Sequence, residues 1–568
     1  MSRHLLIILG ICALTFLTGL GRPALTDSDE AFYAESAREM IERGDFLTPY
    51  YNDEPRFEKP VLYYWLVALA YSITGTTVES ARFPSALAGF GLALLAYFCA
   101  RRWYDELTGC LSGIICATSF GYIAIAHQAL PDLPLAFFVT LTIWSLLLGI
   151  RTEGIKLTPD RRTARWLLLA AVSAAAGILV KGPIAIVLPV CVLVPIICFE
   201  DWNRTSRWLI SRPAIWGSLF CFILIATPWY IGMFVEHGPS YLTRFFFSEN
   251  LERFSTARFN DPRPVWYYLP IIFAGMLPWS PLLLLCIPSI LESFRKHRAP
   301  LTEMRLLLWA AAPLLFYSIS VGKQPRYILP VLPPIAILLA AALRKSWQID
   351  SGRSKLFLVA MLIIGSAFSA FGVLLFQARV LLIEWPEQWT FLIAATLLFF
   401  GLTITALSLA EHSSVYSRII RTRLLPLAVI VVATIFLTVA SYYVLLTSLE
   451  QEPVERMATM LNEERENLEP YGRYGVFNRN LNFYVQSAYV ELPTLDAVRD
   501  FLKSPERVLC IIRAEDAARL EAEGVEFERL GEIDYVNTGN LNFRTFIQAD
   551  SNLHIQHTVL LSNKELSP

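Results

Sequence analysis

The chain has 568 residues, of which 55% are hydrophobic, 13% aromatic and only 17% charged. This composition and a mean hydropathy of +0.47 exclude an ordinary soluble protein and indicate a multi-span membrane protein. The formal net charge of -1 gives no indication of nucleic-acid binding.

Thirteen apolar segments approach the length of about 17 to 25 residues that a helix needs to cross a bilayer. They lie at about 4–20, 83–100, 107–126, 133–150, 166–180, 184–199, 214–235, 265–290, 306–321, 327–343, 356–376, 389–410 and 424–448. The stretch 61–74 is shorter, so we predict an interfacial or re-entrant helix there. The basic start and the lack of a small-residue cleavage site before Gly21 favour an uncleaved first span over a signal peptide.

The loops alternate between basic and non-basic, as the positive-inside rule expects for successive sides of a membrane. The basic loops, for example 151–165 and 344–355, are predicted to be cytoplasmic. The first loop, from Gly21 to Ser80, contains eleven Asp or Glu against five Lys or Arg and belongs to the opposite set. The other predicted outer segments are 127–132, 181–183, 236–264, 322–326 and 377–388.

The tail from Glu450 to Pro568 abandons the apolar pattern. Strand-like runs (Tyr474–Asn478, Val508–Arg513, Asn542–Gln548) alternate there with helical runs (Leu495–Lys503, Ala514–Glu523). We therefore predict an all-α polytopic membrane domain (1–449), with about 13 transmembrane helices and interfacial helices in its outer loop 21–80, followed by a small α/β soluble domain (450–568). After thirteen crossings from a cytoplasmic N-terminus, the tail lies outside.

The acidic segment Asp27-Ser-Asp-Glu-Ala-Phe-Tyr-Ala-Glu35 opens the first outer loop. Asp27 is predicted to cap a helix, with Glu30 at its third position and Gly44 at its end. Its apolar stripe is Tyr33, Ala37, Met40 and Ile41, which is typical of an amphipathic helix on a membrane surface. Asp29 and Glu30 are candidate catalytic carboxylates. The alternative, that they only complement the positive helix N-terminus, stays open.

The box Phe57-Glu58-Lys59-Pro60 is predicted to open a second helix. Its aromatics Tyr63, Tyr64 and Trp65 suit the headgroup level of a membrane. Lys59 is placed to meet a lipid phosphate, since a flexible ammonium is a suitable phosphate partner.

Two further outer turns carry isolated charges. Asp132 lies between two prolines where the third span meets the fourth, and an ionisable residue at that boundary is a functional candidate, with a solvated helix cap as the alternative. Lys181-Gly-Pro183 interrupts a long apolar run and predicts a tight turn. Lys181 is either a second phosphate ligand or a topology marker.

Candidate ligands for substrate also lie in the later outer loops. Aromatics alternate with arginines around Glu249, Asn250 and Arg253, which suits an isoprenoid chain and an anionic headgroup. Lys323, Arg326 and Tyr327 form another cationic and aromatic turn. Histidine and cysteine show no metal-ligand spacing, so no metal site is predicted; the residues identify no cofactor, and a divalent metal stays an open alternative.

Several of these motifs, taken in order along the chain, resemble the aminoarabinose transferase-like (ArnT-like) glycosyltransferases, which are related to protein O-mannosyltransferases and have the C-type fold. They are Asp29-Glu-Ala-Phe-Tyr-Ala-Glu35, Phe57-Glu-Lys-Pro60, Pro131-Asp-Leu-Pro134, Lys181-Gly-Pro183, Glu249-Asn-Leu-Glu-Arg-Phe254, Trp266-Tyr-Tyr-Leu-Pro270, Pro278-Trp-Ser280 and 323–334. Each motif is weak alone, but the ordered set is specific.

The resemblance implies transfer of a sugar, 4-amino-4-deoxy-L-arabinose or similar, from a polyprenyl-phosphate donor on the outer face of the inner membrane. The implied acceptor is an envelope lipid or glycan, chiefly lipid A or lipopolysaccharide. The implied site has Asp29 as principal carboxylate and Asp132 as a second, with Glu58 and Lys59 lining it and Lys59 on the donor phosphate. Phe32 stands where the family usually has a basic residue, so the resemblance leaves the exact sugar and acceptor open.

Two alternatives remain at this level. One is a protein O-mannosyltransferase-like enzyme with a Ser or Thr acceptor. The other is a multi-span lipid or sugar transporter, although transporters tend to bind substrate near the midplane and to contain internal repeats, neither of which is visible in this sequence.

Overall fold

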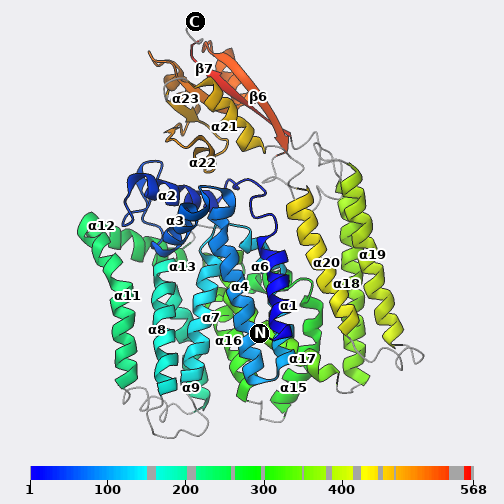
Figure 1. Cartoon of the computed structure of the whole chain (residues 1–568). Helices are drawn as coiled ribbons and strands as arrows, with labels where there is room; N and C mark the ends of the chain where they lie inside the picture. The colour runs from blue at the N-terminus through cyan, green and yellow to red at the C-terminus, as the bar shows by residue number, and fades with distance from the viewer. Residues whose placement is uncertain are drawn as a thin grey trace.

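A bundle of apolar helices forms the larger part of the computed structural model, and a small sheet-containing domain lies against one end of it (Figure 1). The structure describes residues 2–149, 161–200, 213–256, 262–295, 301–347, 351–378, 387–412, 424–445, 452–465, 469–536 and 555–564. The chain is a multi-pass membrane protein, because its long helices are too apolar for water.

Eight of the described helices are long and apolar enough to span a membrane. They include α4 (Val78–Trp103), α7 (Asp132–Gly149), α8 (Arg161–Lys181), α11 (Pro213–His237), α18 (Ser351–Ala378), α19 (Glu387–His412) and α20 (Leu424–Val439). The eighth combines η5 (Pro325–Val331) with α17 (Leu332–Ser346).

Two further predicted spans are bent. The helices α5 (Glu106–Ala117) and α6 (Phe120–Ala126) meet at 53°. The segment 265–290 bends by 111° between its two halves. Those halves are η3 (Val265–Tyr267) with α14 (Tyr268–Gly275), and η4 (Ser280–Leu285) with α15 (Cys286–Arg295). Pro278 and Pro281 lie at this bend, where proline lacks the backbone N–H that a continuous helix needs.

The predicted number of thirteen spans is not confirmed, because the described helices provide eight, or ten if each bent pair is one span. Three other predicted segments do form helices. They are α1 (Arg3–Cys12) continued by η1 (Ala13–Leu17), α9 (Ile184–Glu200) and α16 (Leu301–Ile319). The first two are short, and α16 begins with the charged residues Glu303 and Arg305.

The first loop folds into α2 (Asp29–Arg43), the short strands β1 (Tyr50–Tyr51) and β2 (Glu54–Pro55), and α3 (Leu62–Thr74). Gly44 ends α2 in the left-handed region, with φ of 66°, as predicted. The apolar stripe is buried at Tyr33, Ala37 and Met40, whereas Ile41 is exposed. Tyr63 and Tyr64 are fully buried against Tyr33, so their rings pack inside the protein.

Beyond α11, the chain continues through α12 (Pro239–Leu242), η2 (Thr243–Glu252) and α13 (Arg253–Ser255). After α20 and its continuation η7 (Ala440–Leu445), the C-terminal domain begins with α21 (Pro453–Glu464). Its other helices are α22 (Leu481–Val485), α23 (Leu495–Leu502) and α24 (Ala514–Ala522). Its strands are β3 (Tyr471–Arg473), β4 (Val490–Glu491), β5 (Leu509–Arg513), β6 (Glu528–Val536) and β7 (Ile555–Ser562).

The predicted α/β character of the C-terminal domain is confirmed. Its sheet has the order β4-β3-β5-β7-β6, parallel around β3 and antiparallel around β7. Alternate residues of β5 enter two cores: Leu509 and Ile511 pack with α21 and α22, and Cys510 and Ile512 with α23 and α24. The sheet is therefore covered on both faces.

The sequence located β5, α23 and α24 but missed other elements of this domain. The predicted strand 474–478 is wrong, because β3 ends at Arg473 and the chain then leaves the sheet. The predicted strand 542–548 lies outside the described residues.

The C-terminal domain and the first loop interlock. Ala24 is buried in the core around α21 and α22, while Phe483 of α22 is buried with residues of α2 and α3. Arg22 Nη1 lies 2.8 Å from Glu455 Oε2. Figure 1 shows α2, α3 and α22 stacked between the bundle and the sheet.

Candidate active site

Two carboxylates from distant parts of the chain share one arginine. Asp29 is the first residue of α2 and Asp132 the first residue of α7. Arg326 donates from Nη2 to Asp29 Oδ2, and its Nε lies 3.4 Å from Asp132 Oδ2. The structure thus brings together Asp29, Asp132 and Arg326, three of the residues that the sequence nominated.

A second cation neutralises Asp132. Lys181, the last residue of α8, donates from Nζ to Asp132 Oδ1 at 2.5 Å, and its ammonium lies 4.8 Å from the ring centroid of Tyr327. The next residue, Gly182, has φ of +86°, and a Cβ there would approach the Phe245 ring to 2.8 Å. Glycine therefore permits the predicted tight turn that holds Lys181 at the site.

The two carboxylates differ in their access to solvent. The Asp132 side chain is 3% exposed and that of Asp29 39% exposed. Partial burial acts to raise the pKa of Asp29, but the guanidinium of Arg326, aided by Arg479 and Arg56, outweighs it and holds the pKa below its ordinary value. Asp29 is therefore an ionised, accessible carboxylate at neutral pH.

A cavity of about 90 Å³ adjoins this cluster through Lys181 and Tyr327. Its polar lining is Lys59, Lys181, Glu249, Asn250, Arg253, Ser320 and Tyr327. Its remaining lining is Ile184, Phe254, Phe316, Tyr317 and Gly322. One cavity thus offers both cations and an apolar wall.

Three charged residues of the cavity form one network. Glu249 is buried and accepts from Arg253 Nη2 at 2.7 Å, and Lys59 Nζ lies 3.4 Å from the same carboxylate oxygen. Lys59 also donates to the carbonyl of Glu58 at 2.8 Å. Burial, together with the nearby Arg253 charge, lowers the pKa of Lys59 to about 8.

Glu58 does not line the cavity and pairs with two arginines beside it. It accepts from Arg244 Nη2 at 2.9 Å and lies 3.5 Å from Arg56 Nε. Burial alone would raise the pKa of Glu58, but Arg56 and then Arg244 lower it below its ordinary value. Glu58 therefore holds two arginines beside the site.

Of the remaining predicted substrate ligands, Asn250 lines the cavity and Lys323 does not. Asn250 lines the cavity and donates its amide to the carbonyl of Phe245 at 2.7 Å. Lys323 is buried but does not line the cavity; its ammonium donates to the carbonyls of Ser320 and Arg263. The Lys323 ammonium, which the sequence analysis assigned to substrate binding, is therefore bound by backbone carbonyls instead.

Glu30 is buried in a structural network. Its carboxylate accepts from Arg82 Nη2 at 3.0 Å, from the Thr26 N–H at 2.8 Å and from the Ala129 N–H at 3.0 Å. Both Glu30 and Arg82 are fully buried. Glu30 therefore ties the start of α2 to α4 and to the segment before Asp132, and it does not face the cavity.

Asp27 also departs from its predicted role. It does not cap α2, whose N-cap residue is Ser28. Its carboxylate instead accepts from the backbone N–H groups of Asn478 and Arg479 in the C-terminal domain, at 2.9 and 2.5 Å. Asp27 therefore makes a tertiary contact with the C-terminal domain in place of the predicted local cap of α2.

Sequence reasoning missed two arginines at the site. Arg479 Nη1 lies 3.5 Å from Asp29 Oδ1, and Arg56 adds to the positive field on Asp29. Arg56 stands near the nominated Glu58-Lys59 pair, so its position was a usable signal. Arg479 lies 450 positions beyond Asp29 and carries no local signal.

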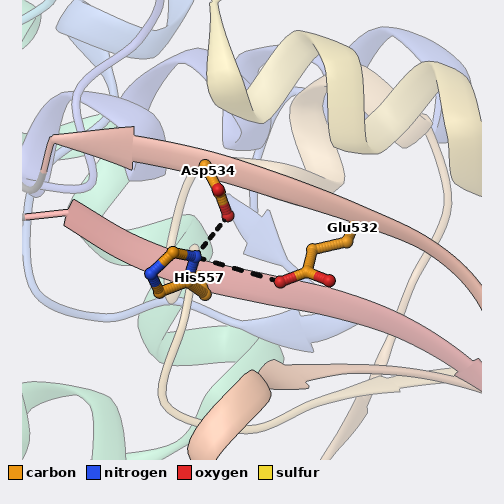
Figure 2. A group of neighbouring side chains, drawn as sticks. All are labelled: Glu532, Asp534 and His557. Atoms are coloured by element: carbon orange, nitrogen blue, oxygen red, sulfur yellow. Dashed lines mark hydrogen bonds and ion pairs between the residues drawn. The ribbon is translucent and has the colours of Figure 1, made fainter.

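Within the part of the chain that the structure describes, the one group of three side chains arranged to hold a metal ion is Glu532, Asp534 and His557. All three are exposed on β6 and β7, where His557 Nδ1 lies 2.5 Å from Asp534 and 3.9 Å from Glu532 (Figure 2). Asp534 and His557 face each other in the strand register and are hydrogen-bonded, so a cross-strand hydrogen bond accounts for the group.

Comparison with known proteins identifies similar sequences. The family model for dolichyl-phosphate-mannose-protein mannosyltransferase matches residues 23–238. The undecaprenyl phosphate-alpha-4-amino-4-deoxy-L-arabinose arabinosyl transferase of Yersinia pestis (strain Pestoides F) is 32% identical over 330 residues. That alignment covers 58% of this chain and 57% of the relative's length.

Solved structures extend the similarity to the whole fold. The crystal structure of ArnT from Cupriavidus metallidurans bound to undecaprenyl phosphate matches with a TM-score of 0.75 at 20% identity, over 99% of both chains. The resemblance to the ArnT-like glycosyltransferases is confirmed. A weaker structural match to this chain is the oligosaccharyltransferase AglB from Archaeoglobus fulgidus, with a TM-score of 0.51 at 13% identity, over 89% of this chain and 69% of that one.

The buried pair of Glu30 and Arg82 generates a first prediction, on stability. Glu30→Gln leaves the Arg82 charge buried without its counter-ion, which is expected to destabilise the protein by about 3–5 kcal/mol. Thermal unfolding in detergent measures this loss. The double variant Glu30→Gln/Arg82→Gln should lose less than the sum of the two single variants, and additive losses would contradict an energetic coupling.

A second prediction concerns pH. Only protonated Lys59 attracts a phosphate, so the affinity of the cavity for a phosphate-bearing ligand should be highest below pH 8 and fall by up to about tenfold per pH unit above it. Binding to the solubilised protein between about pH 6.5 and 9.5 avoids most of the phosphate titration, whose second pKa is about 6. In Lys59→Arg the charge persists, so this decline should disappear; an unchanged decline would assign it to another group.

Proposed function

We propose that this chain is a membrane glycosyltransferase that moves 4-amino-4-deoxy-L-arabinose, or a similar sugar, from a polyprenyl phosphate to an envelope acceptor, lipid A or lipopolysaccharide. The observation that carries the proposal is the pair Asp29 and Asp132, bridged by Arg326 beside a cationic cavity with an apolar wall. Fold alone would not support a specific chemistry.

The cavity suits a polyprenyl phosphate as donor. Lys59, Lys181 and Arg253 offer cations to a phosphate. Ile184, Phe254 and Phe316 offer an apolar surface to the first isoprene units. Two similar proteins agree with this class of donor. The Yersinia pestis protein is named as an undecaprenyl phosphate-alpha-4-amino-4-deoxy-L-arabinose arabinosyl transferase, and the Cupriavidus metallidurans ArnT was crystallised bound to undecaprenyl phosphate.

The proposed reaction is a displacement at the anomeric carbon. An acceptor oxygen forms the new bond to that carbon, and the bond from carbon to the phosphate oxygen breaks, with the electron pair leaving on the polyprenyl phosphate. The departing phosphate gains one negative charge, so cations already in place stabilise the transition state more than the bound donor. Lys59, Lys181 and Arg253 are assigned this role.

Asp29 is assigned to the acceptor side. Its lowered pKa makes it a weak base, which suits an acceptor that has no tightly held proton, such as an ionised phosphate of lipid A. A serine or threonine hydroxyl would require a stronger base. Asp29 then stabilises positive charge at the sugar carbon beside the acceptor, while Asp132 holds Lys181 and Arg326 in place.

The proposal includes location. We infer that residues 1–449 form the transferase domain in the inner membrane, with the loop 21–80 on its outer face, and that residues 450–568 lie in the periplasm. The basic loops on the other side support this orientation. The site residues gather at the end of the bundle that faces the C-terminal domain, whereas transporters tend to bind near the midplane.

Replacement of the carboxylate tests the proposal. Asp29→Asn should reduce transfer from undecaprenyl-phosphate aminoarabinose to lipid A by about 10²- to 10³-fold, because the positive charge that develops at the sugar carbon loses its stabilising carboxylate. Mass spectrometry of lipid A after incubation with the purified protein in proteoliposomes measures the product. A fully active Asp29→Asn enzyme would remove the central claim.

Asp53→Asn is the matched control. Asp53 lies in the same loop, is exposed, and pairs with Arg43 rather than with the site. Its φ of 67° is one that asparagine accepts readily, so this variant should retain full transfer. Movement of the intact lipid between leaflets without sugar transfer would instead support a transporter.

A further inference from the structure

Two arginine side chains lie over the ring of Phe32. The guanidinium carbon of Arg56 is 4.0 Å from the ring centroid and that of Arg479 is 5.2 Å from it. Tyr51 packs edge-on against the same ring at 4.6 Å. Phe32 carries no charge, but the face of its ring attracts both guanidinium cations.

Arg479 reaches this ring from the C-terminal domain, in the connection between β3 and α22. The Asp27 carboxylate binds the backbone N–H groups of Asn478 and Arg479, and the Tyr51 hydroxyl donates to the Arg479 carbonyl at 3.0 Å. Asn480 donates its amide to the carbonyl of Leu25 at 2.8 Å. The backbone on both sides of Arg479 is therefore fixed to the first loop.

The guanidinium of Arg479 lies beside the solvent-accessible carboxylate of Asp29. Arg479 Nη1 is 3.5 Å from Asp29 Oδ1, and its side chain is 43% exposed. An ion pair of this length and exposure is weak, so a stronger anion can replace Asp29 as partner of Arg479. Arg479 does not line the donor cavity. Arg56 is more buried and has Glu58 within 3.5 Å.

We propose that the C-terminal domain completes the catalytic site by supplying Arg479 as an acceptor-binding residue. Arg479 takes an anionic group of the acceptor, a phosphate, in the planar two-bond geometry that guanidinium offers. The acceptor oxygen then lies beside Asp29, on a different side of the cluster from the donor cavity. This inference rests on the proposed transferase function and assigns the specificity for an anionic acceptor to a residue of the second domain.

Acceptor kinetics of the full chain test the inference. In Arg479→Ala, loss of a charge-assisted contact should raise the KM for phosphate-bearing lipid A by about tenfold to a hundredfold. The KM for the polyprenyl-phosphate sugar and the affinity for undecaprenyl phosphate should change less than about twofold. Arg479→Lys keeps the charge but not the planar fork, so it should restore part of the loss.

Arg513→Ala is a matched control. Arg513 also belongs to the C-terminal domain, is 44% exposed and lies 3.4 Å from its carboxylate partner Glu515. This variant should keep the acceptor KM of the wild type. Unfolding of Arg479→Ala would appear as a lowered thermal midpoint and lost undecaprenyl phosphate binding; Arg479→Lys and Arg479→Gln then provide the comparison.

The inference and the proposed function fail in different ways. If the wild type transfers sugar and Arg479→Ala keeps the acceptor KM, or raises the donor and acceptor KM equally, Arg479 is not an acceptor ligand. If the wild type transfers no sugar, the proposed function fails, and binding of phosphate-bearing lipid A in nanodiscs tests Arg479 alone. Equal binding by wild type and Arg479→Ala would overturn the inference.

Discussion

The guanidinium of Arg326, held between Asp29 and Asp132, is the interaction on which the site depends. It joins the starts of two helices and a turn, and Arg326 and Asp29 are 297 positions apart. Two carboxylates that share one guanidinium would repel each other without a cation between them. Arg326, with Lys181 on Asp132, removes that repulsion. The site can exist only after these segments have packed together.

The scaffold around this cluster uses the same physical rule. Glu30 and Arg82 are fully buried, and each is satisfied by the other and by backbone groups. Their pairing fixes the start of α2 against α4 and against the chain just before Asp132. Neighbouring residues of one acidic segment therefore have separate roles. Asp27 binds the C-terminal domain, Asp29 faces the site, and Glu30 joins α2 to α4 through Arg82.

Cations gather around the carboxylates of the site in three groups. Lys59, Lys181 and Arg253 line the cavity, Arg56 and Arg244 surround Glu58, and Arg479 arrives from the second domain. Such an arrangement suits a reaction in which both substrates carry negative charge, because each anion then has its own partners. The family model ends at residue 238, so Arg253, Arg326 and Arg479, which the proposed chemistry uses, all lie beyond it.

The sequence alone determined the membrane class, the turn at Gly182 and the end of α2 at Gly44, and it nominated Asp29, Asp132, Lys59 and Lys181 as charges beside apolar segments. These are effects of local composition and backbone preference, which act within a few residues. It did not determine the number of spans, since a 111° bend and a short helix look like ordinary apolar segments. Only the tertiary structure decided that Glu30 is buried against Arg82, that Lys323 is bound by carbonyls, and that Arg479 meets Asp29. Those outcomes depend on ion pairs between residues far apart in the chain, whose energy comes from a burial that no local pattern encodes.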